Sequence, residues 1–325
     1  QSNVVTTIAH AINQPGRDKL TKMKLRSGRH KVLKAYAVDP TGMRQEASSI
    51  RGNTVRFRQL SVGSTVVLQY RVDERADGYL AGHISRRWWF QGGNAQTEVS
   101  RWVFWMPTKT TLNEAVYGQG IQRTTRIVGE FTRVEWMAKD QEPVLAEPRM
   151  PGFQDVATHL VLSTVPSWQV FFKWEEALLV DAFRASPEVT ALAKKLSRIA
   201  STPVEKIQRI HEYLMQEIRY QQDYERSIAG VKPHAAPVVL ARQYGDCKDK
   251  AVLFITLARL MGLKVHFALV RTRDASPVTR SVPMQQFNHA IVYVPKQPGI
   301  PAGRFYDPTV DALDIELLRH DDQGT

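Results

Sequence analysis

The chain has 325 residues, enough for two domains with ordinary cores, and its hydrophobic content of 43% is ordinary for a folded protein. Its formal net charge of +12 raises the question of an anionic partner, such as nucleic acid, cell wall or a membrane surface. The sequence contains no zinc-finger, helix-turn-helix or glycine-rich phosphate motif, and no apolar run reaches the roughly eighteen residues of a membrane span. We therefore expect no transmembrane segment and no nucleic-acid partner.

The chain begins Gln1-Ser2-Asn3, without a starting methionine or a signal sequence. We expect a processed or trimmed chain, which fits an exported, periplasmic protein, although a cloned fragment would look the same. One cysteine is compatible with either compartment.

A basic segment follows between Arg17 and Lys34. Its positive charge has two explanations, an anionic partner surface and the solvated face of ordinary strands, and the second is the commoner. The basic residues are Arg17, Lys19, Lys22, Lys24, Arg26, Arg29, Lys31 and Lys34.

The first half of the chain is typical of β structure. Segments 54–60, 65–72, 101–107 and 133–136 carry strand-forming residues separated by turns, and the first begins with strict polar–apolar alternation. Several short strands of this kind predict an all-β, sandwich-like N-terminal domain over 1–165. Five tryptophans fall in this half, and a sandwich core with a few at its rim explains them better than an aromatic sugar- or peptide-binding face. They are Trp88, Trp89, Trp102, Trp105 and Trp136.

A proline-rich connector is predicted near 142–151, with Val144, Leu145 and Met150 as its anchors. The second domain, 166–325, then turns helical. Ser186 is suited to cap a helix over 187–200, and Thr202-Pro203-Val204-Glu205 is a capping box with proline at the first helical position.

The helix opened by that capping box has one predicted apolar face. His211 and Glu212 lie beside the face, and we interpret them as surface residues rather than metal ligands. Strands are predicted at 265–270, 290–294 and 304–306, which gives the second domain an α+β arrangement. The residues of the apolar face are Val204, Ile207, Ile210, Leu214 and Ile218.

The only cysteine, Cys247, lies in the run Gly245-Asp246-Cys247-Lys248-Asp249-Lys250, directly before a long apolar stretch. Gly245 permits a tight turn, Asp246 is suited to cap a helix, and the stretch ends at Gly262. Cys247 is thus expected in the first turn of a buried helix, where the helix dipole favours the thiolate and nearby lysines add positive charge. The alternative is a small cysteine that only packs at a helix start.

Two further residues suggest partners for the cysteine. His289 lies near the start of a half-buried strand predicted over 287–294, and Asp307 ends the next strand. A nucleophile at a helix N-terminus, a histidine on a strand and an acid on the following strand make a plausible triad. Taken singly, each partner has a plainer explanation, because a lone histidine is usually structural and an Asp-Pro pair is usually a turn.

These three motifs together resemble the bacterial transglutaminase-like superfamily, which has a papain-like fold and a Cys-His-Asp triad. The resemblance implies Cys247 as the nucleophile, His289 as the base and Asp307 as the orienting acid. It also implies a side chain that helps to bind the oxyanion, together with the backbone N–H of Cys247. The candidates for that side chain are Tyr220, Gln221 and Gln222.

The region upstream, from about 31 to 174, resembles the β-rich domain of unknown function that often precedes such domains. The runs that carry this looser match are 35–42, 60–70 and 163–168.

The resemblance implies acyl transfer through a thioester on a peptide or protein amide, with no cofactor and no metal. Water as acceptor would make the protein a peptidase or amidase, and an amine would make it an acyltransferase. The contrasting hypothesis is a non-catalytic scaffold that binds a protein or an anionic surface. Residues 285–287 are candidates for the acceptor side, and segment 273–283 is either a lid or an ordinary loop.

Overall fold

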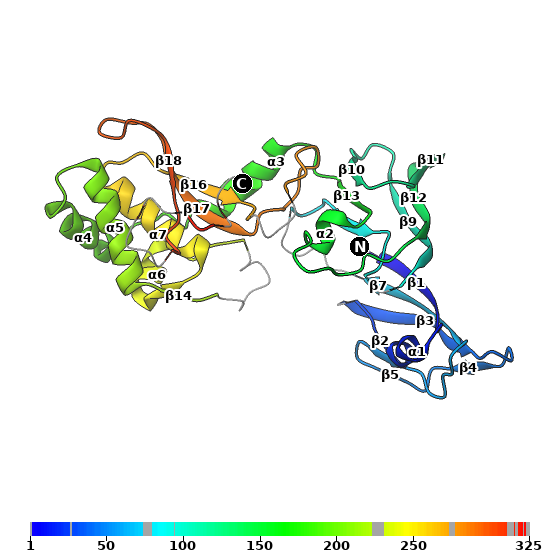
Figure 1. The fold of residues 1–325 in the computed structure, drawn as a ribbon. Helices are drawn as coiled ribbons and strands as arrows, with labels where there is room; N and C mark the ends of the chain where they lie inside the picture. Colours follow the sequence, from blue (N-terminus) through cyan, green and yellow to red (C-terminus); the bar gives the residue numbers. More distant parts are fainter. Residues whose placement is uncertain are drawn as a thin grey trace. The chain divides into compact units, whose positions relative to one another are not determined.

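The computed structural model describes residues 2–26, 28–73, 80–93, 95–222, 231–272, 277–310, 315, 318–320 and 322. The chain divides into two compact units, Gln1–Asp77 and Gly78–Thr325 (Figure 1). The domain boundary predicted at residue 165 falls inside the second unit, between strand β13 (His159–Ser163) and helix α3 (Trp168–Leu179), and it stays a prediction.

The first unit has two small antiparallel sheets and one short helix. One sheet has the order β1-β7-β3-β4 and the other the order β2-β6-β5. Both sheets contribute apolar side chains to one core, including Val55 from β6 and Leu68 from β7. The elements are β1 (Ser2–His10), α1 (Gln14–Leu20), β2 (Lys22–Lys24), β3 (Arg29–Val38), β4 (Arg44–Glu46), β5 (Ser49–Arg51), β6 (Thr54–Arg56) and β7 (Thr65–Asp73).

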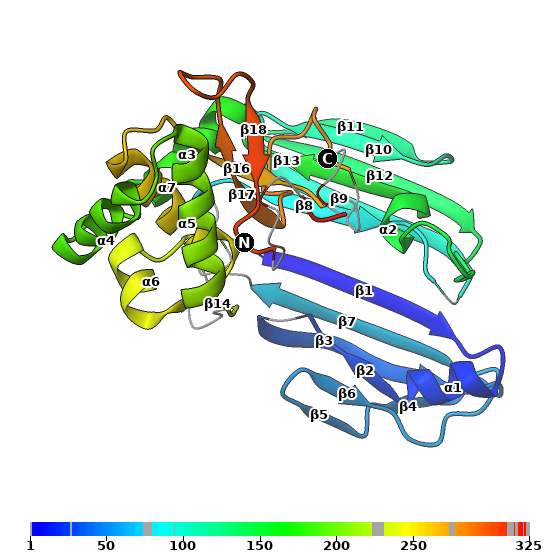
Figure 2. The ribbon, with the colours of Figure 1, turned by 60° about the vertical axis from the view of Figure 1, so that its left-hand side comes forward.

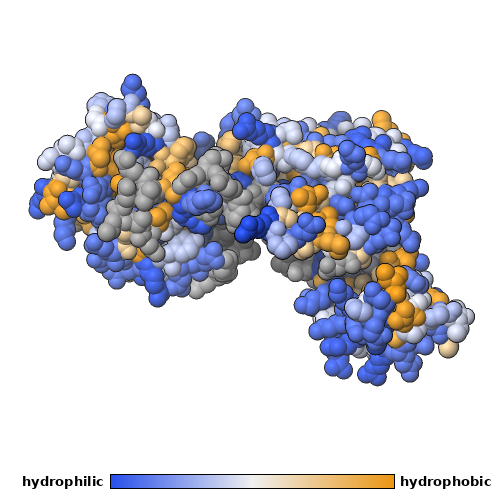
Figure 3. Space-filling view, viewed as in Figure 1, coloured by the Kyte–Doolittle hydropathy of each residue, from blue (hydrophilic) through white to orange (hydrophobic). Residues whose placement is uncertain are grey.

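The basic segment between Arg17 and Lys34 lies in α1, β2 and β3 of this unit. Apart from the half-buried Arg17, its lysine and arginine side chains are exposed. Hydrophilic side chains cover most of the viewed face of this unit (Figure 3). This is the arrangement expected of a solvated face.

The β part of the second unit also consists of two antiparallel sheets, with the orders β10-β13-β8 and β11-β12-β9. Side chains from both sheets form a second core around Trp136, which is fully buried. Trp88 and Trp102 are half-buried and stacked, whereas Trp89 and Trp105 are exposed. The strands are β8 (Ser85–Trp89), β9 (Thr97–Pro107), β10 (Asn113–Tyr117), β11 (Gln122–Val128) and β12 (Phe131–Gln141).

The prediction of a β-rich N-terminal region is thus confirmed, but its apolar residues form two separate cores. The connector near 142–151 has no helix or strand and turns at 148–149, and the Val144 N–H donates to the carbonyl of Gly92 at 3.0 Å. Leu145, predicted as an anchor, is exposed.

The rest of the second unit is the predicted α+β region. Its sheet has the order β16-β17-β18, and α7 packs against β17. Helices α4 to α7 gather on one side of this sheet in both views (Figure 2). The elements are α2 (Phe153–Val156), α4 (Pro187–Arg198), α5 (Pro203–Glu217), β14 (Arg219–Tyr220), α6 (Ala236–Arg242), β15 (Tyr244–Gly245), α7 (Cys247–Leu260), β16 (His266–Val270), β17 (His289–Val294) and β18 (Arg304–Tyr306).

The capping predictions for this region are confirmed, but two assignments on α5 are wrong. Ser186 caps α4, and Thr202 and Glu205 form the capping box of α5. His211, which we had placed at the surface, is only 2% exposed, while Val204 on the predicted apolar face is 47% exposed. The reason is that α5 packs against both α4 and α7, so its buried face is wider than a single stripe and begins one turn later.

None of the described helices is long and apolar enough to cross a membrane.

Candidate active site

The site is built around the first turn of α7. Asp246 has extended backbone angles, and its side chain accepts from the N–H of Asp249 while Asp249 accepts from the N–H of Asp246. This reciprocal capping box fixes where the helix begins. Cys247 is therefore the first helical residue, as predicted, and it is half-buried.

Asp249 also ties this turn to the segment before α6. Its Oδ1 accepts from the backbone N–H of His234 at 2.8 Å, and its Oδ2 lies 3.1 Å from Nδ1 of the same residue. Asp249 is 1% exposed. A single buried carboxylate thus holds the helix start and a distant segment together, which keeps the position of Cys247 fixed.

The two lysines of the motif are buried. Lys248 forms a hydrogen-bonded ion pair with Asp246, and Nζ of Lys250 donates to the carbonyl of Ile218 at 3.0 Å. The carbonyl of Ile218 follows the last turn of α5, so Lys250 links the end of α5 to the start of α7. The positive charge that we expected beside Cys247 is therefore partly compensated by Asp246.

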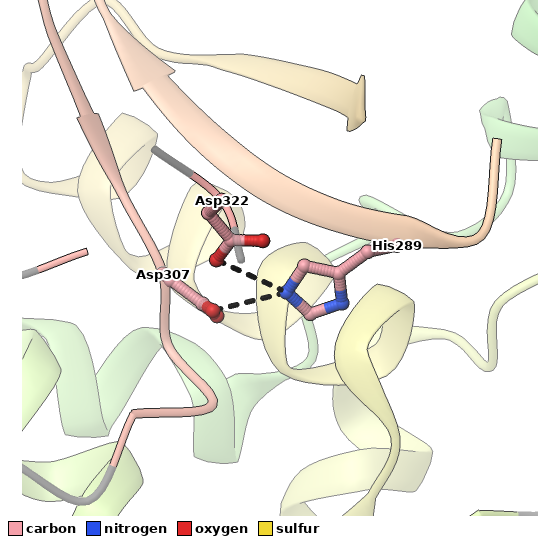
Figure 4. A group of neighbouring side chains, drawn as sticks. All are labelled: His289, Asp307 and Asp322. Carbon is pink, nitrogen blue, oxygen red and sulfur yellow. Dashed lines mark hydrogen bonds and ion pairs between the residues drawn. The ribbon is translucent and has the colours of Figure 1, made fainter. Parts of the chain in front are cut away.

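His289 and Asp307 lie on neighbouring strands and contact each other directly. Nε2 of His289 is 2.9 Å from Oδ2 of Asp307, and both side chains are buried (Figure 4). The other oxygen of Asp307, Oδ1, accepts from the N–H of Thr309 at 2.8 Å and from its hydroxyl at 2.7 Å. Because these bonds orient the carboxylate, the imidazole ring is held with Nδ1 facing away from Asp307.

The electrostatics of this pair favour the imidazolium form. Burial alone would lower the pKa of His289, but hydrogen bonds and charge interactions with Asp307 and Cys247 raise that pKa to about 10. Burial opposes ionisation of Asp307 as well, yet its bonds with His289 and Thr309 lower its pKa to about 2. An ionised pair is thus present at neutral pH.

The structure brings all three predicted triad residues together. The side chains of Cys247 and His289 line one pocket, and Cys247 contributes to the raised pKa of His289. Since Nε2 of His289 is bonded to Asp307, Nδ1 is the ring nitrogen that this bond leaves available. The full lining of this pocket is Glu175, Val231, Cys247, Lys248, Phe267, Leu269, Gln285, Phe287, Asn288, His289 and Ala290.

The oxyanion candidates lie on the strand next to the cysteine. Residues 219–220 form β14, which pairs in parallel with β15 so that Tyr220 is opposite Gly245. The N–H of Gln221 donates to the carbonyl of Gly245 at 3.0 Å. Burial, followed by the charge of Cys247, raises the pKa of Tyr220, and its side chain bonds to Gln222. Of the three candidates, Tyr220 is the one whose pKa responds to the charge of Cys247.

The loop before His289 is held by its own hydrogen bonds. Gln285 and Phe287 line the pocket, whereas Gln286 is buried and bonds to the backbone of Thr279 and Val282. Of the segment that we considered as a lid, 273–276 lie outside the described residues. Thr279 in its described part also contacts the hydroxyl of Tyr117 at 2.8 Å, which anchors the loop on β10.

Comparison with known proteins agrees with this geometry. Residues 190–302 match the model of the transglutaminase-like superfamily. The chain carries a transglutaminase-like domain. The matched residues contain Cys247 and His289, while Asp307 follows shortly after them.

Among solved structures, a candidate protease from Parabacteroides distasonis overlays with a TM-score of 0.64 and 15% identity, over 93% of this chain and 59% of that one. This likeness concerns the fold, and the chain spans 59% of that protein's length. No curated protein matches the chain.

Two other structures are more distant. A candidate cysteine protease from Cytophaga hutchinsonii has 13% identity and a TM-score of 0.32, over 70% of this chain and 75% of that one. The periplasmic domain of TgpA from Pseudomonas aeruginosa has 13% identity and a TM-score of 0.27, over 89% and 93%. These two superpose too loosely to define a shared fold.

The sequence analysis missed one acid of the transglutaminase-like domain. Oδ2 of Asp322 lies 3.9 Å from Nε2 of His289, on the same ring nitrogen that Asp307 contacts (Figure 4). Burial and then a hydrogen bond with Asp307 raise the pKa of Asp322 to about 7. His289, Asp307 and Asp322 also have the donor types and the closeness of a metal site. No local sequence pattern identifies Asp322, because it comes close to His289 only in the folded chain.

The analysis also missed Glu175 on α3, which lines the pocket with Cys247. The sequence did carry a signal here. Phe171, Glu175 and Leu179 are spaced by four residues on one helix face, so an acidic residue occupies a core position.

Proposed function

We propose that the transglutaminase-like domain catalyses acyl transfer through a thioester, with Cys247 as nucleophile, His289 as acid and base, and Asp307 as the orienting acid. The substrate is the amide of a peptide or protein. The observation that supports this most is that Cys247 and His289 line one pocket while the His289 ring is bonded to Asp307. A structural cysteine does not require a buried imidazolium beside it.

The reaction begins with the Cys247 thiolate paired to the His289 imidazolium. The sulfur attacks the amide carbon, and the carbonyl oxygen becomes an oxyanion, for which the proposed donors are the N–H of Cys247 and the side chain of Tyr220. As the C–N bond breaks, the imidazolium would give its proton to the leaving amine. Asp307 would remain a carboxylate throughout and keep the ring oriented.

The thioester is then released by a second acceptor. Water or an amine attacks the thioester carbon, neutral His289 takes the proton of the attacking group, and the C–S bond breaks to return the thiolate–imidazolium pair. Hydrolysis and transfer use the same residues, so the triad does not select between a peptidase and an acyltransferase. Both belong to the same proposal, cysteine-dependent acyl transfer.

The experiment that tests the triad is the pH dependence of Cys247 alkylation by iodoacetamide, followed by intact mass. The chain has one cysteine, so each mass increment reports on that residue alone. We expect fast labelling at pH 6 in the wild type and a loss of at least tenfold in His289→Ala. Slow labelling with an ordinary thiol profile in both proteins would instead favour the scaffold hypothesis.

A positive result would be followed by peptide substrates with and without added amines. Product masses would separate hydrolysis from aminolysis. Cys247→Ala should be inactive in both assays while keeping its circular dichroism spectrum.

A further inference from the structure

The pocket beside Cys247 contains a carboxyl group that the proposed reaction does not use. Glu175 lies in the middle of α3, on the same face as Phe171 and Leu179, and it is only 5% exposed. The next residue, Glu176, is exposed on the opposite side of the helix. The two neighbouring glutamates therefore differ in environment, and Glu175 occupies a position that normally holds an apolar side chain.

Both carboxyl oxygens of Glu175 lack a hydrogen-bond partner among the residues that the structure describes. Among the described residues that line this pocket, the two cationic side chains are already paired, Lys248 with Asp246 and His289 with Asp307. A buried polar group without a partner is rare in folded proteins and calls for an explanation, such as a catalytic role, an ordered water or a bound ligand. Burial raises the pKa of Glu175 to about 7, so a large part of the population is ionised at neutral pH.

The other walls of the pocket are mostly apolar. The apolar lining is Val231, Phe267, Leu269, Phe287 and Ala290, and the remaining polar lining is Lys248, Gln285 and Asn288. A carboxylate within apolar walls matches a particular ligand shape, an aliphatic stem that ends in a positive charge. An ammonium group offers three donors, enough for both oxygens of Glu175, and such charge-assisted bonds are strong in a site with little water.

We propose that Glu175 forms a subsite for a primary ammonium group of the substrate, next to the carbon that Cys247 attacks. The inference rests on the proposed function and deepens it, since it names the substrate class. The ammonium group has two sources, a lysine-like side chain of the acyl donor and the amine that accepts the acyl group. Both present the same chemistry to Glu175, and the two arms of the experiment distinguish them.

The first arm compares two peptidyl chloromethyl ketones that differ at one residue, lysine or its uncharged counterpart norleucine. The rate of Cys247 labelling is followed by intact mass, with the substituted residue moved through successive positions from the reactive group. At one position we expect the lysine reagent to label Cys247 about 10- to 100-fold faster than the norleucine reagent. In Glu175→Gln the two labelling rates should be about equal. Glu175→Met should instead prefer norleucine, because its pocket is apolar throughout.

The second arm needs no catalysis. In Cys247→Ala, n-butylammonium chloride should raise the melting temperature in a saturable way, while n-butanol and sodium chloride at matched concentrations should not. The shift should vanish in Cys247→Ala/Glu175→Gln. Glu176→Gln is the matched control in both arms, because it makes the same charge change on the solvent side of α3.

The outcomes separate the two hypotheses. A lysine preference that depends on Glu175 identifies the donor side chain as the source, and binding of the free amine alone identifies the acceptor. Neither effect, with fast iodoacetamide labelling in every variant, would overturn the subsite and leave the triad intact. Slow iodoacetamide labelling in the wild type would refute the triad, while the second arm would still decide the subsite.

Discussion

Gly245 lies so close to Asp249 that no other residue fits in its place. A Cβ atom on Gly245 would be 2.6 Å from Cβ of Asp249 and 3.2 Å from its Oδ2. Asp249 is buried and bonded to Asp246 and His234, so it has no room to move aside. Gly245 therefore allows the close approach of Asp249 on which the first turn of α7 depends.

We predict that Gly245→Ala displaces this turn and the cysteine with it. The alkylation rate of Cys247 at pH 6 should fall by about tenfold or more, since even small misplacements are costly in a catalytic pair. Overpacking should also destabilise the protein by about 1–3 kcal/mol, measured by urea unfolding.

Gly262→Ala is the matched control for this variant. Gly262 ends the same helix with a positive φ of +83°, and nothing lies near the added Cβ. The control should lose stability because alanine resists that backbone conformation, yet it should keep the wild-type alkylation rate. Equal loss of rate in both variants would show that stability, not the placement of Cys247, controls the reaction.

Asp307→Asn tests the orienting acid. The asparagine keeps the size of the side chain but removes the charge that stabilises the His289 imidazolium, so turnover should fall by about 100-fold or more while weak activity remains. The measurement is the rate of thioester formation with a peptide ester, compared with Thr309→Val as a variant that only loosens the carboxylate. Full activity in Asp307→Asn would remove Asp307 from the triad.

The same pair predicts how stability depends on acid. The pKa of Asp307 falls from 3.8 to about 2 on folding, so its stabilisation is complete above pH 4 and is lost as the pH falls through 2. The loss amounts to about 2 kcal/mol. Asp307→Asn should lack this loss. His289 affects stability at the alkaline end of the pH range. Its raised pKa stabilises the fold below pH 6.5, and this contribution disappears as the pH rises through about 10.

The local parts of this site could be predicted from sequence because their signals are local. The capping residue Asp246, the helix end at Gly262 and the strand that begins at His289 are each encoded within a few residues. A helix start also places its first residue without reference to the rest of the fold. This is why the position of Cys247 was predictable from the motif alone.

The parts that could not be predicted depend on packing between distant segments. His211 is buried because α5 has neighbours on two sides, and Asp322 matters only because it returns to the His289 ring. The separation of the β region into two cores depends on which sheets face each other, which alternation within a strand does not encode.

Asp322→Asn tests the second acid beside His289. Burial and Asp307 raise the pKa of Asp322, and the charge of His289 opposes that rise, so by linkage an ionised Asp322 favours the imidazolium. Removing this charge should move the loss of the His289 proton to lower pH, followed by the Cε1–H signal in NMR. Asp181→Asn, on the exposed surface, is the control and should leave the titration unchanged. An unchanged His289 titration in Asp322→Asn would show that the second carboxylate has no influence on the ring.

Glu175→Gln gives a stability prediction that is independent of any substrate. Because burial raises the pKa of Glu175 from 4.5 to about 7, the wild type loses stability as the pH rises between these values. The loss reaches about 3 kcal/mol above pH 7. Relative to the wild type, Glu175→Gln should therefore become more stable between pH 4 and pH 8 in urea unfolding, whereas Glu176→Gln should show a flat difference. If the stability difference between Glu175→Gln and the wild type also does not change with pH, the carboxylate already has a partner. The pocket beside Cys247 would then have no free carboxylate to bind a cation.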